Sequence, residues 1–195
     1  MTGMTPTEAI ETPEIEKKTA RRLPVWAFVL AFVALAGFLG LIGWGLSRQT
    51  QGALQIGDRV PEFSGATFGG VPFDTRQYAG KVVVVNFWAS WCKPCEQEAA
   101  SLETAYQHYR PGEQVVFLGL AWVDTEPNSL AYLQKFGITY PNGPDLATKI
   151  SQIFRVKGVP ETYIIDQEGR LAYSKIGPFS STDEIIAAVD SVLAK

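Results

Sequence analysis

The chain has 195 residues, of which 46% are hydrophobic and 19% charged, and its formal net charge is -3. This length suits one globular domain with additional segments and is too short for two sizeable cores. No run of Lys or Arg occurs outside the N-terminal region, so the sequence offers no basic surface for a phosphate backbone and argues against nucleic-acid binding.

The N-terminal part of the chain predicts a tail followed by a membrane anchor. Residues 1–22 are rich in Thr, Glu, Pro and Lys without apolar periodicity, which predicts a disordered tail. Residues 23–46 carry no charge, and about 24 residues at ~1.5 Å each give ~36 Å of helix, enough to cross a ~30 Å hydrocarbon core. A cleaved signal peptide is the alternative, but its apolar core is usually shorter and no small-x-small cleavage site precedes a plausible mature start. We therefore predict an uncleaved signal anchor.

The distribution of basic residues around the predicted span gives its orientation. Four Lys and Arg residues lie within residues 17–22, whereas only Arg48 follows the span closely. The positive-inside rule then places the N-terminus in the cytoplasm. We predict a single-pass protein of the cell membrane, with residues 47–54 as a linker and residues 55–195 as one extracytoplasmic domain.

In that domain the first strand and helix patterns predict a parallel unit. The β-branched run at residues 82–88 is typical of a strand covered on both faces. Apolar residues recur at helical spacing from Pro94 to about Tyr109, and residues 115–121 predict a second buried strand. Two parallel strands joined by a helix form a right-handed crossover.

The rest of the domain predicts more helices and an antiparallel edge. Residues 129–136 and 146–154 have helical patterns separated by Gly and Pro. Residues 162–166 and 171–176 flank a stretch with the composition of a hairpin turn. Ser-Thr-Asp-Glu at residues 181–184 predicts a capping box and a closing helix.

The two cysteines of the chain, Cys92 and Cys95, stand where the first predicted strand meets the helix. Their spacing is too short to link distant segments, and with the single His108 they are too few for a four-coordinate zinc site. A helix N-terminus offers unpaired N–H groups and a positive dipole end, both of which favour a thiolate. Cys92 is therefore the predicted nucleophile and the more exposed thiol, and Cys95 the thiol that resolves the mixed disulfide.

The two residues between the cysteines fit the same interpretation. Lys93 adds a positive charge beside Cys92, and Pro94 suits a first helical turn because its missing N–H is not needed there. A pair of inert buried thiols or half of a zinc site remains the alternative.

Residues 86–95, Asn-Phe-Trp-Ala-Ser-Trp-Cys-Lys-Pro-Cys, resemble the active-site signature of the thioredoxin superfamily over its full length. Residues 57–63, Gly-Asp-Arg-Val-Pro-Glu-Phe, resemble the opening of its redoxin and TlpA-like branch. With these two stretches and the predicted anchor, the chain is similar to the ResA-like and DsbE-like thiol–disulfide oxidoreductases of cytochrome c maturation. The resemblance implies an α/β thioredoxin-like fold, with a mixed central sheet flanked by helices, and no cofactor besides the redox-active cysteine pair.

The resemblance also implies how a substrate is bound. Residues 158–162, Gly-Val-Pro-Glu-Thr, match the position of the family's cis-proline, so we expect Pro160 to be cis and to face the disulfide. The backbone of Val159 would then pair with a substrate strand. Trp91, Lys93 and Pro94 complete the predicted substrate contacts.

One departure from the thioredoxin pattern bears on proton transfer. Thioredoxins carry a buried Asp six residues before the first Cys, whereas this chain has Asn86, which cannot act as a base. The resemblance implies that Glu161, next to Pro160, takes part of this role; an exposed surface Glu is the alternative. Trp88, Trp91 and Trp122 form either an apolar surface around the cysteines or part of the core.

The function implied by the resemblance is reduction of the haem-binding cysteines of apocytochrome c. A membrane electron donor of the CcdA/DsbD type would regenerate the dithiol. The alternatives are a general extracytoplasmic disulfide reductase or oxidase, a non-catalytic docking domain, and a redoxin-type enzyme acting on peroxides. For the last, the chain has no Pro-x-x-x-Thr/Ser-x-x-Cys sequence around a peroxidatic cysteine.

Overall fold

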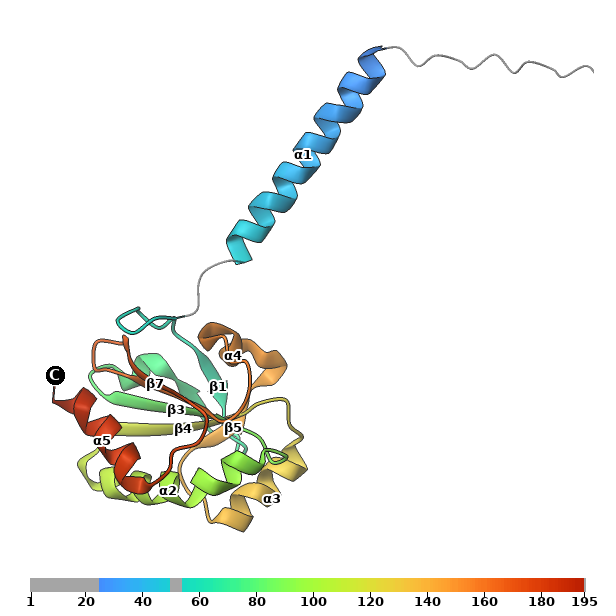
Figure 1. Cartoon of the computed structure of the whole chain (residues 1–195). Coiled ribbons are helices and arrows are strands. Elements are labelled where there is room, and N and C mark those ends of the chain that lie inside the picture. The colour runs from blue at the N-terminus through green and yellow to red at the C-terminus, as the bar shows by residue number, and fades with distance from the viewer. Residues whose placement is uncertain (1–24, 50–53, 195) are drawn as a thin grey trace, which may run out of the picture. The chain divides into compact units, whose positions relative to one another are not determined.

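The computed structural model describes residues 25–49 and 54–194, which belong to two separate units (Figure 1). The predicted tail at residues 1–22 and residues 50–53 of the predicted linker lie outside the described residues.

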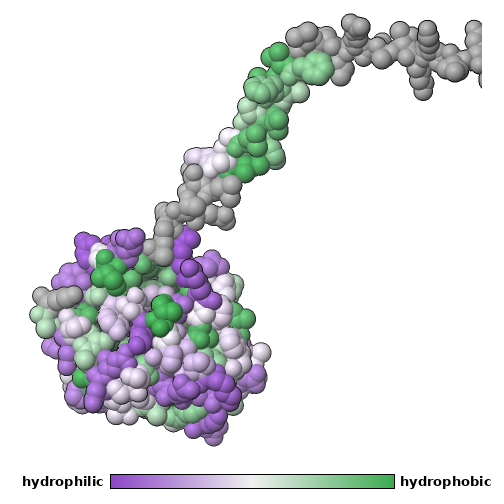
Figure 2. Space-filling view, in the orientation of Figure 1, coloured by the Kyte–Doolittle hydropathy of each residue, from purple (hydrophilic) through white to green (hydrophobic). Residues whose placement is uncertain are grey.

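The first unit holds the helix α1, Val25–Gln49. Large apolar side chains such as Trp26, Phe32 and Leu41 are exposed along it. Figure 2 shows hydrophobic residues over much of the surface of this helix. Within the described residues, no helix combines the length and apolar character needed to cross a membrane. The anchor at residues 23–46, which starts before the first described residue, stays a prediction.

A mixed sheet of five strands forms the centre of the second unit. The strands are ordered β5-β4-β3-β6-β7, with β3, β4 and β5 parallel and the pairs β3–β6 and β6–β7 antiparallel. The C-terminal ends of the three parallel strands therefore lie at the same edge of the sheet. The strands are β3 Val82–Trp88, β4 Val115–Ala121, β5 Asn142–Pro144, β6 Glu161–Ile165 and β7 Leu171–Ile176.

Helices cover both faces of this sheet, as the layers in Figure 1 show. One face carries α2, Lys93–Tyr109, α3, Glu126–Phe136, and α5, Thr182–Leu193. The other carries α4, Lys149–Phe154, and the antiparallel hairpin of β1, Ser64–Ala66, and β2, Pro72–Asp74. Short 3₁₀ turns at Thr75–Tyr78, Arg110–Gly112 and Leu146–Thr148 join these elements.

The strand β3 is the centre of the core, because all seven of its residues are buried. Side chains alternate along it: Val83, Val85 and Phe87 pack on the α4 face, and Val82 and Val84 pack on the α2 and α5 face. Complete burial of a side chain such as Phe87 contributes about 1.5–3 kcal/mol to folding. Strand β3 thus fixes the position at which the segment between Trp88 and α2 begins.

The predicted thioredoxin-like α/β fold and most predicted elements are confirmed, but several differ. The hairpin of β1 and β2 was not predicted. The helix predicted at residues 146–154 starts as a 3₁₀ turn, so α4 itself is short. Strand β5 was not predicted, since Asn-Gly-Pro becomes a strand only by pairing with β4. The capping box is half formed: Ser181 Oγ accepts the Glu184 N–H at 3.2 Å, but the Glu184 carboxylate contacts Ser180 and Lys175 instead.

A buried polar contact joins the C-terminal end of β3 to β5, across β4. Trp88 Nε1 donates to Asn142 Oδ1 at 2.8 Å, and Asn142 Nδ2 donates to the carbonyl of Tyr140 at 2.9 Å. Gly119 leaves room for this contact, because a Cβ there would lie 1.8 Å from Asn142 Oδ1.

We predict that Gly119→Ala lowers the free energy of unfolding by about 1–3 kcal/mol, since the added methyl group displaces Asn142 from Trp88. Urea unfolding of the oxidised protein measures this loss. Gly112→Ala is the control, because a Cβ at Gly112 meets nothing within 4 Å. Equal stability losses in the two variants would contradict the role of Gly119.

Candidate active site

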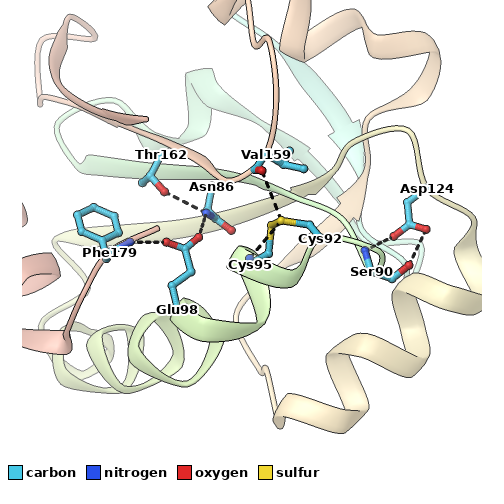
Figure 3. Close-up of a disulfide and its surroundings, with 9 residues drawn as sticks. All are labelled: Asn86, Ser90, Cys92, Cys95, Glu98, Asp124, Val159, Thr162 and Phe179. Carbon is cyan, nitrogen blue, oxygen red and sulfur yellow. Dashed lines mark hydrogen bonds between the residues drawn. A yellow bond between two sulfur atoms is a disulfide. The ribbon is translucent and has the colours of Figure 1, made fainter. Parts of the chain in front are cut away.

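Cys92 and Cys95 form a disulfide at the N-terminus of α2 (Figure 3). Cys92 is the N-cap residue, and its Sγ accepts the Cys95 N–H at 3.1 Å. The same Sγ lies 3.4 Å from the carbonyl oxygen of Val159. The sequence predicts an exposed Cys92, yet the two residues are only 3% and 1% exposed, because the Val159 loop lies against the disulfide.

The loop that faces the disulfide contains a cis peptide bond between Val159 and Pro160, as the resemblance implies. Pro160 is buried and Val159 is half-buried. The sheet explains their position: Glu161 pairs with Phe87, so the residue before β6 lies beside the last residue of β3. The antiparallel register thereby brings this loop to the beginning of α2.

Trp91, Lys93 and Pro94 are exposed around the disulfide. The Trp91 ring is 56% exposed; its Nε1 donates to the carbonyl of Val123 at 3.1 Å, and its centroid lies 6.3 Å from that of Trp122. Trp91 and Trp122 thus form an aromatic surface beside Cys92. Trp88, in contrast, is buried and stacks on Tyr132.

The positive charge of Lys93 is compensated by a neighbouring carboxylate. Lys93 Nζ lies 3.3 Å from Glu96, and Lys135 Nζ lies 3.2 Å from the same carboxylate. Hydrogen bonds from Lys135 and Lys93 lower the pKa of Glu96. Lys93 therefore adds less to thiolate stabilisation than the sequence suggests, because Glu96 carries the opposite charge.

Glu98, which sequence reasoning missed, is a buried carboxyl on the same helix as the cysteines (Figure 3). Its Oε1 accepts Asn86 Nδ2 at 3.0 Å, and its Oε2 accepts the Phe179 N–H at 2.8 Å. Asn86 Nδ2 also donates to Thr162 Oγ1 at 3.0 Å. Burial raises the pKa of Glu98 to about 7, while the hydrogen bonds from Phe179 and Asn86 act in the opposite direction.

The position of Glu98 in the sequence could have indicated a functional role. It stands three residues after Cys95, which places both on one face of a helix. That face is otherwise apolar, with Ala99 and Leu102 buried. A carboxylate at a core position of a helix that starts with two cysteines is a candidate acid or base.

Glu161 is also buried, so the alternative of an exposed surface Glu is wrong. Its Oε2 accepts the Tyr163 hydroxyl at 2.6 Å, and its Oε1 accepts the Lys157 N–H at 3.2 Å. Burial, followed by the hydrogen bond to Glu161, raises the pKa of Tyr163. Because Glu161 is paired with Phe87, it belongs to the α4 face of the sheet, whereas Asn86 and its partners belong to the α2 face.

Three hollows lie on the described part of the domain. An open groove of about 340 Å³ is next to the aromatic surface, lined by Trp122, Thr148, Ser151, Gln152, Arg155 and Val156. A cavity of about 430 Å³ is lined by residues that include Tyr78, Lys81 and Val83, at the start of β3. The length of β3 separates this cavity from the cysteines by on the order of 15 Å. A third hollow of about 290 Å³ is lined by Ser90, Glu96, Asn128, Ala131, Tyr132 and Lys135, so it lies, like the groove, close to the disulfide.

A thioredoxin-like fold with a disulfide at a helix N-terminus, opposite a cis-proline loop, defines a thiol–disulfide oxidoreductase. Residues 56–174 match the AhpC/TSA family, and the chain belongs to this family.

Several known proteins similar to this chain are named as thiol–disulfide interchange proteins or oxidoreductases. Thiol:disulfide interchange protein HelX of Rhodobacter capsulatus is 31% identical over 171 residues, which cover 85% of this chain and 94% of HelX. Thiol-disulfide oxidoreductase ResA of Bacillus cereus is 28% identical over 149 residues, 76% of this chain and 86% of ResA. The crystal structure of a thiol:disulfide interchange protein from Chlorobium tepidum matches with a TM-score of 0.65 at 28% identity, covering 72% of this chain and 99% of that protein.

We predict that Cys95→Ala traps substrates as mixed disulfides through Cys92, because Cys92 is the cysteine that lies at the helix N-cap and borders the exposed Trp91. Non-reducing electrophoresis and mass spectrometry identify the trapped species. Cys92→Ala is the matched control and should trap nothing. Trapping by Cys92→Ala and not by Cys95→Ala would reverse the assignment.

Proposed function

We propose that the chain reduces disulfides outside the cytoplasm and that the haem-binding cysteines of apocytochrome c are its substrate. The observation that carries the chemistry is the position of Cys92 at the α2 N-cap, where its sulfur accepts the Cys95 N–H. The choice of apocytochrome c is supported by the resemblance of residues 57–63 and 86–95 to the cytochrome-maturation group.

The two cysteines make and break the bonds to sulfur. In the dithiol form the Cys92 thiolate attacks one sulfur of the substrate disulfide, forms a mixed disulfide and releases the other sulfur as a thiolate. The Cys95 thiolate then attacks Cys92 Sγ, which releases the second substrate sulfur. The substrate gains two electrons, and the Cys92–Cys95 disulfide is the oxidised product.

The substrate would bind as an extended polypeptide across the disulfide. The half-buried backbone of Val159 at the cis-proline loop supports pairing with a substrate strand. The exposed ring of Trp91 and the groove at Trp122 supply an apolar surface for the side chains beside the substrate cysteines.

The location outside the cytoplasm is supported by one related structure and by the sequence. A disulfide oxidoreductase of Mycobacterium tuberculosis, described as secreted and homologous to DsbE, is 25% identical and covers 66% of this chain. We propose residues 23–46 as the anchor in the cell membrane, supported by the exposed apolar side chains of α1. A membrane electron donor of the CcdA/DsbD type would then return the disulfide to the dithiol.

We also propose that Glu98 accepts the proton of Cys95 before its attack. Glu98 follows Cys95 by one helical turn, is buried and has a raised pKa of about 7, which suits a base at neutral pH. The role predicted for Glu161 is the competing proposal, and the two carboxylates lie on opposite faces of the sheet.

We predict that Glu98→Gln lowers the rate of mixed-disulfide resolution at pH 8 by about tenfold or more and removes its inflection near pH 7, because a neutral amide cannot accept the proton. Stopped-flow measurements from pH 5 to 9 record the profile. Glu161→Gln is the matched variant and should keep the inflection. If only Glu161→Gln loses the inflection in the pH profile, Glu161 is the residue that accepts the Cys95 proton.

Stability gives a second test of Glu98. Since its folded-state pKa of about 7 exceeds the ordinary 4.5, the unfolded chain binds fewer protons between these pH values, and stability falls as pH rises from 4.5 to 7. This loss is on the order of 3 kcal/mol. Urea unfolding at pH 5 and pH 8 should show a smaller difference in Glu98→Gln than in the parent chain.

The substrate proposal predicts that the full-length dithiol protein reduces an oxidised Cys-x-x-Cys-His peptide at least about tenfold faster than an oxidised peptide with the cysteines in another sequence, because the aromatic surface contacts neighbouring side chains. Thiol release measures both rates. Equal rates would favour a general disulfide reductase, and oxidation of reduced peptides would favour an oxidase.

The proposed topology predicts that a reporter active only outside the cytoplasm works when fused after Lys195. This follows from the basic residues at 17–22, which favour a cytoplasmic N-terminus. A reporter that is active only in the cytoplasm serves as the paired control. Activity of that control alone would contradict the proposed location and substrate.

A further inference from the structure

The loop before Cys92 is held by the loop that follows β4. Trp122 and the two residues after it, Val123 and Asp124, each contact the segment between Trp88 and Trp91. The Trp122 N–H donates to the Trp88 carbonyl at 2.8 Å, Trp91 Nε1 donates to the Val123 carbonyl at 3.1 Å, and Ser90 donates to Asp124.

Asp124 makes the largest number of these contacts (Figure 3). Its Oδ2 accepts the Ser90 N–H at 2.6 Å and its Oδ1 accepts the Ser90 hydroxyl at 2.9 Å. The same carboxylate accepts the Thr125 N–H at 2.8 Å and the Ser129 hydroxyl at 3.1 Å, at the beginning of α3. Hydrogen bonds to a charged acceptor are the stronger kind, so Asp124 ties Ser90 to α3.

We propose that Asp124 is a positioning residue that keeps Cys92 at the α2 N-cap when the disulfide is open. In the oxidised form the S–S bond itself holds Cys92 Sγ near the Cys95 N–H. In the dithiol and mixed-disulfide forms that bond is gone. The turn from Ala89 to Cys92, closed by the Cys92 N–H to Ala89 carbonyl bond at 3.1 Å, then depends on the contacts of Ser90 with Asp124.

This inference rests on the thiol–disulfide chemistry of the site and not on the identity of the substrate. If Asp124 acted on Cys92 mainly by its charge, its removal would lower the pKa of the Cys92 thiol, because a nearby negative charge disfavours a thiolate. If it acts by position, its removal raises that pKa, because the sulfur loses the Cys95 N–H and the helix N-terminus. The sign of the change therefore separates the two effects.

The test is a titration of the Cys92 thiolate by ultraviolet absorbance in the full-length chain carrying Cys95→Ala, which leaves one thiol. We expect Asp124→Ala to raise the pKa of Cys92 by about 0.5–1. Asp124→Asn removes the same charge but retains an oxygen for the Ser90 N–H and an amide that can donate to the Ser90 hydroxyl, at the cost of the Thr125 N–H contact. Its Cys92 pKa should therefore not rise as it does in Asp124→Ala, and it should lie at or below the parent value. The charged groups Lys93, Glu96, Glu98 and Lys135 are the same in all variants.

Asp145→Ala controls for a general loss of stability. Asp145 is buried, whereas Asp124 is half-buried, and it accepts two backbone donors, the Ile150 N–H at 2.9 Å and the Ser151 N–H at 3.0 Å. It should destabilise the domain without moving the pKa of Cys92. If Asp124→Ala does not fold, Ser90→Ala decides, because it removes only the hydroxyl contact and should raise the pKa less. An unchanged or lowered pKa in the decisive variant, or an equal rise in Asp124→Asn, would overturn the proposal.

Discussion

The N-terminus of α2 lies directly after the buried strand β3, and the position of both sulfurs depends on this junction. Strand β3 is covered on both faces and cannot shift without breaking the core. Cys92 therefore lies at a fixed helix N-cap, with its sulfur on the Cys95 N–H. The pairing of β6 with β3 brings Pro160 to the same place. One strand thus brings Cys92, Cys95 and the Pro160 loop together, and the contacts of Ser90 with Asp124 hold the turn that precedes Cys92.

Side-chain alternation on β3 and β6 divides the buried polar groups between the two faces of the sheet. Asn86 and Thr162 lie on the α2 face. The Asn86 amide donates there to both Thr162 and Glu98. Phe87 and its partner Glu161 lie on the α4 face, where the carboxylate is bound by the Tyr163 hydroxyl. Two buried carboxylates therefore have different neighbours, and only Glu98 shares a helix with the cysteines. This division is the physical reason why we propose Glu98, and not Glu161, as the acceptor of the Cys95 proton.

The sequence predicts those features that depend on local patterns, and it misses those that depend on pairing at a distance. The strand at residues 82–88, the helix after it and the cysteine pair follow from periodicity and composition. Strand β5 has no strand propensity and exists because β4 offers an edge. The contact between Ser90 and Asp124 joins residues 34 positions apart, so spacing gave no sign of it. Glu161 could be placed beside Pro160 by the sequence, but its face of the sheet required the register with β3.

We propose that electrons flow from the cysteine pair to the substrate, and the surroundings of Cys92 favour this direction. A strong oxidant needs a stabilised reduced form, that is, a strongly stabilised thiolate. Here the charge of Lys93 is compensated by Glu96, and the carbonyl of Val159 lies 3.4 Å from Cys92 Sγ, where it disfavours a negative charge. The reduction potential of the full-length protein, equilibrated against glutathione buffers, is the most direct test. A reducing role predicts a value near that of thioredoxin, about -270 mV, and a value near that of the oxidant DsbA, about -120 mV, would contradict it.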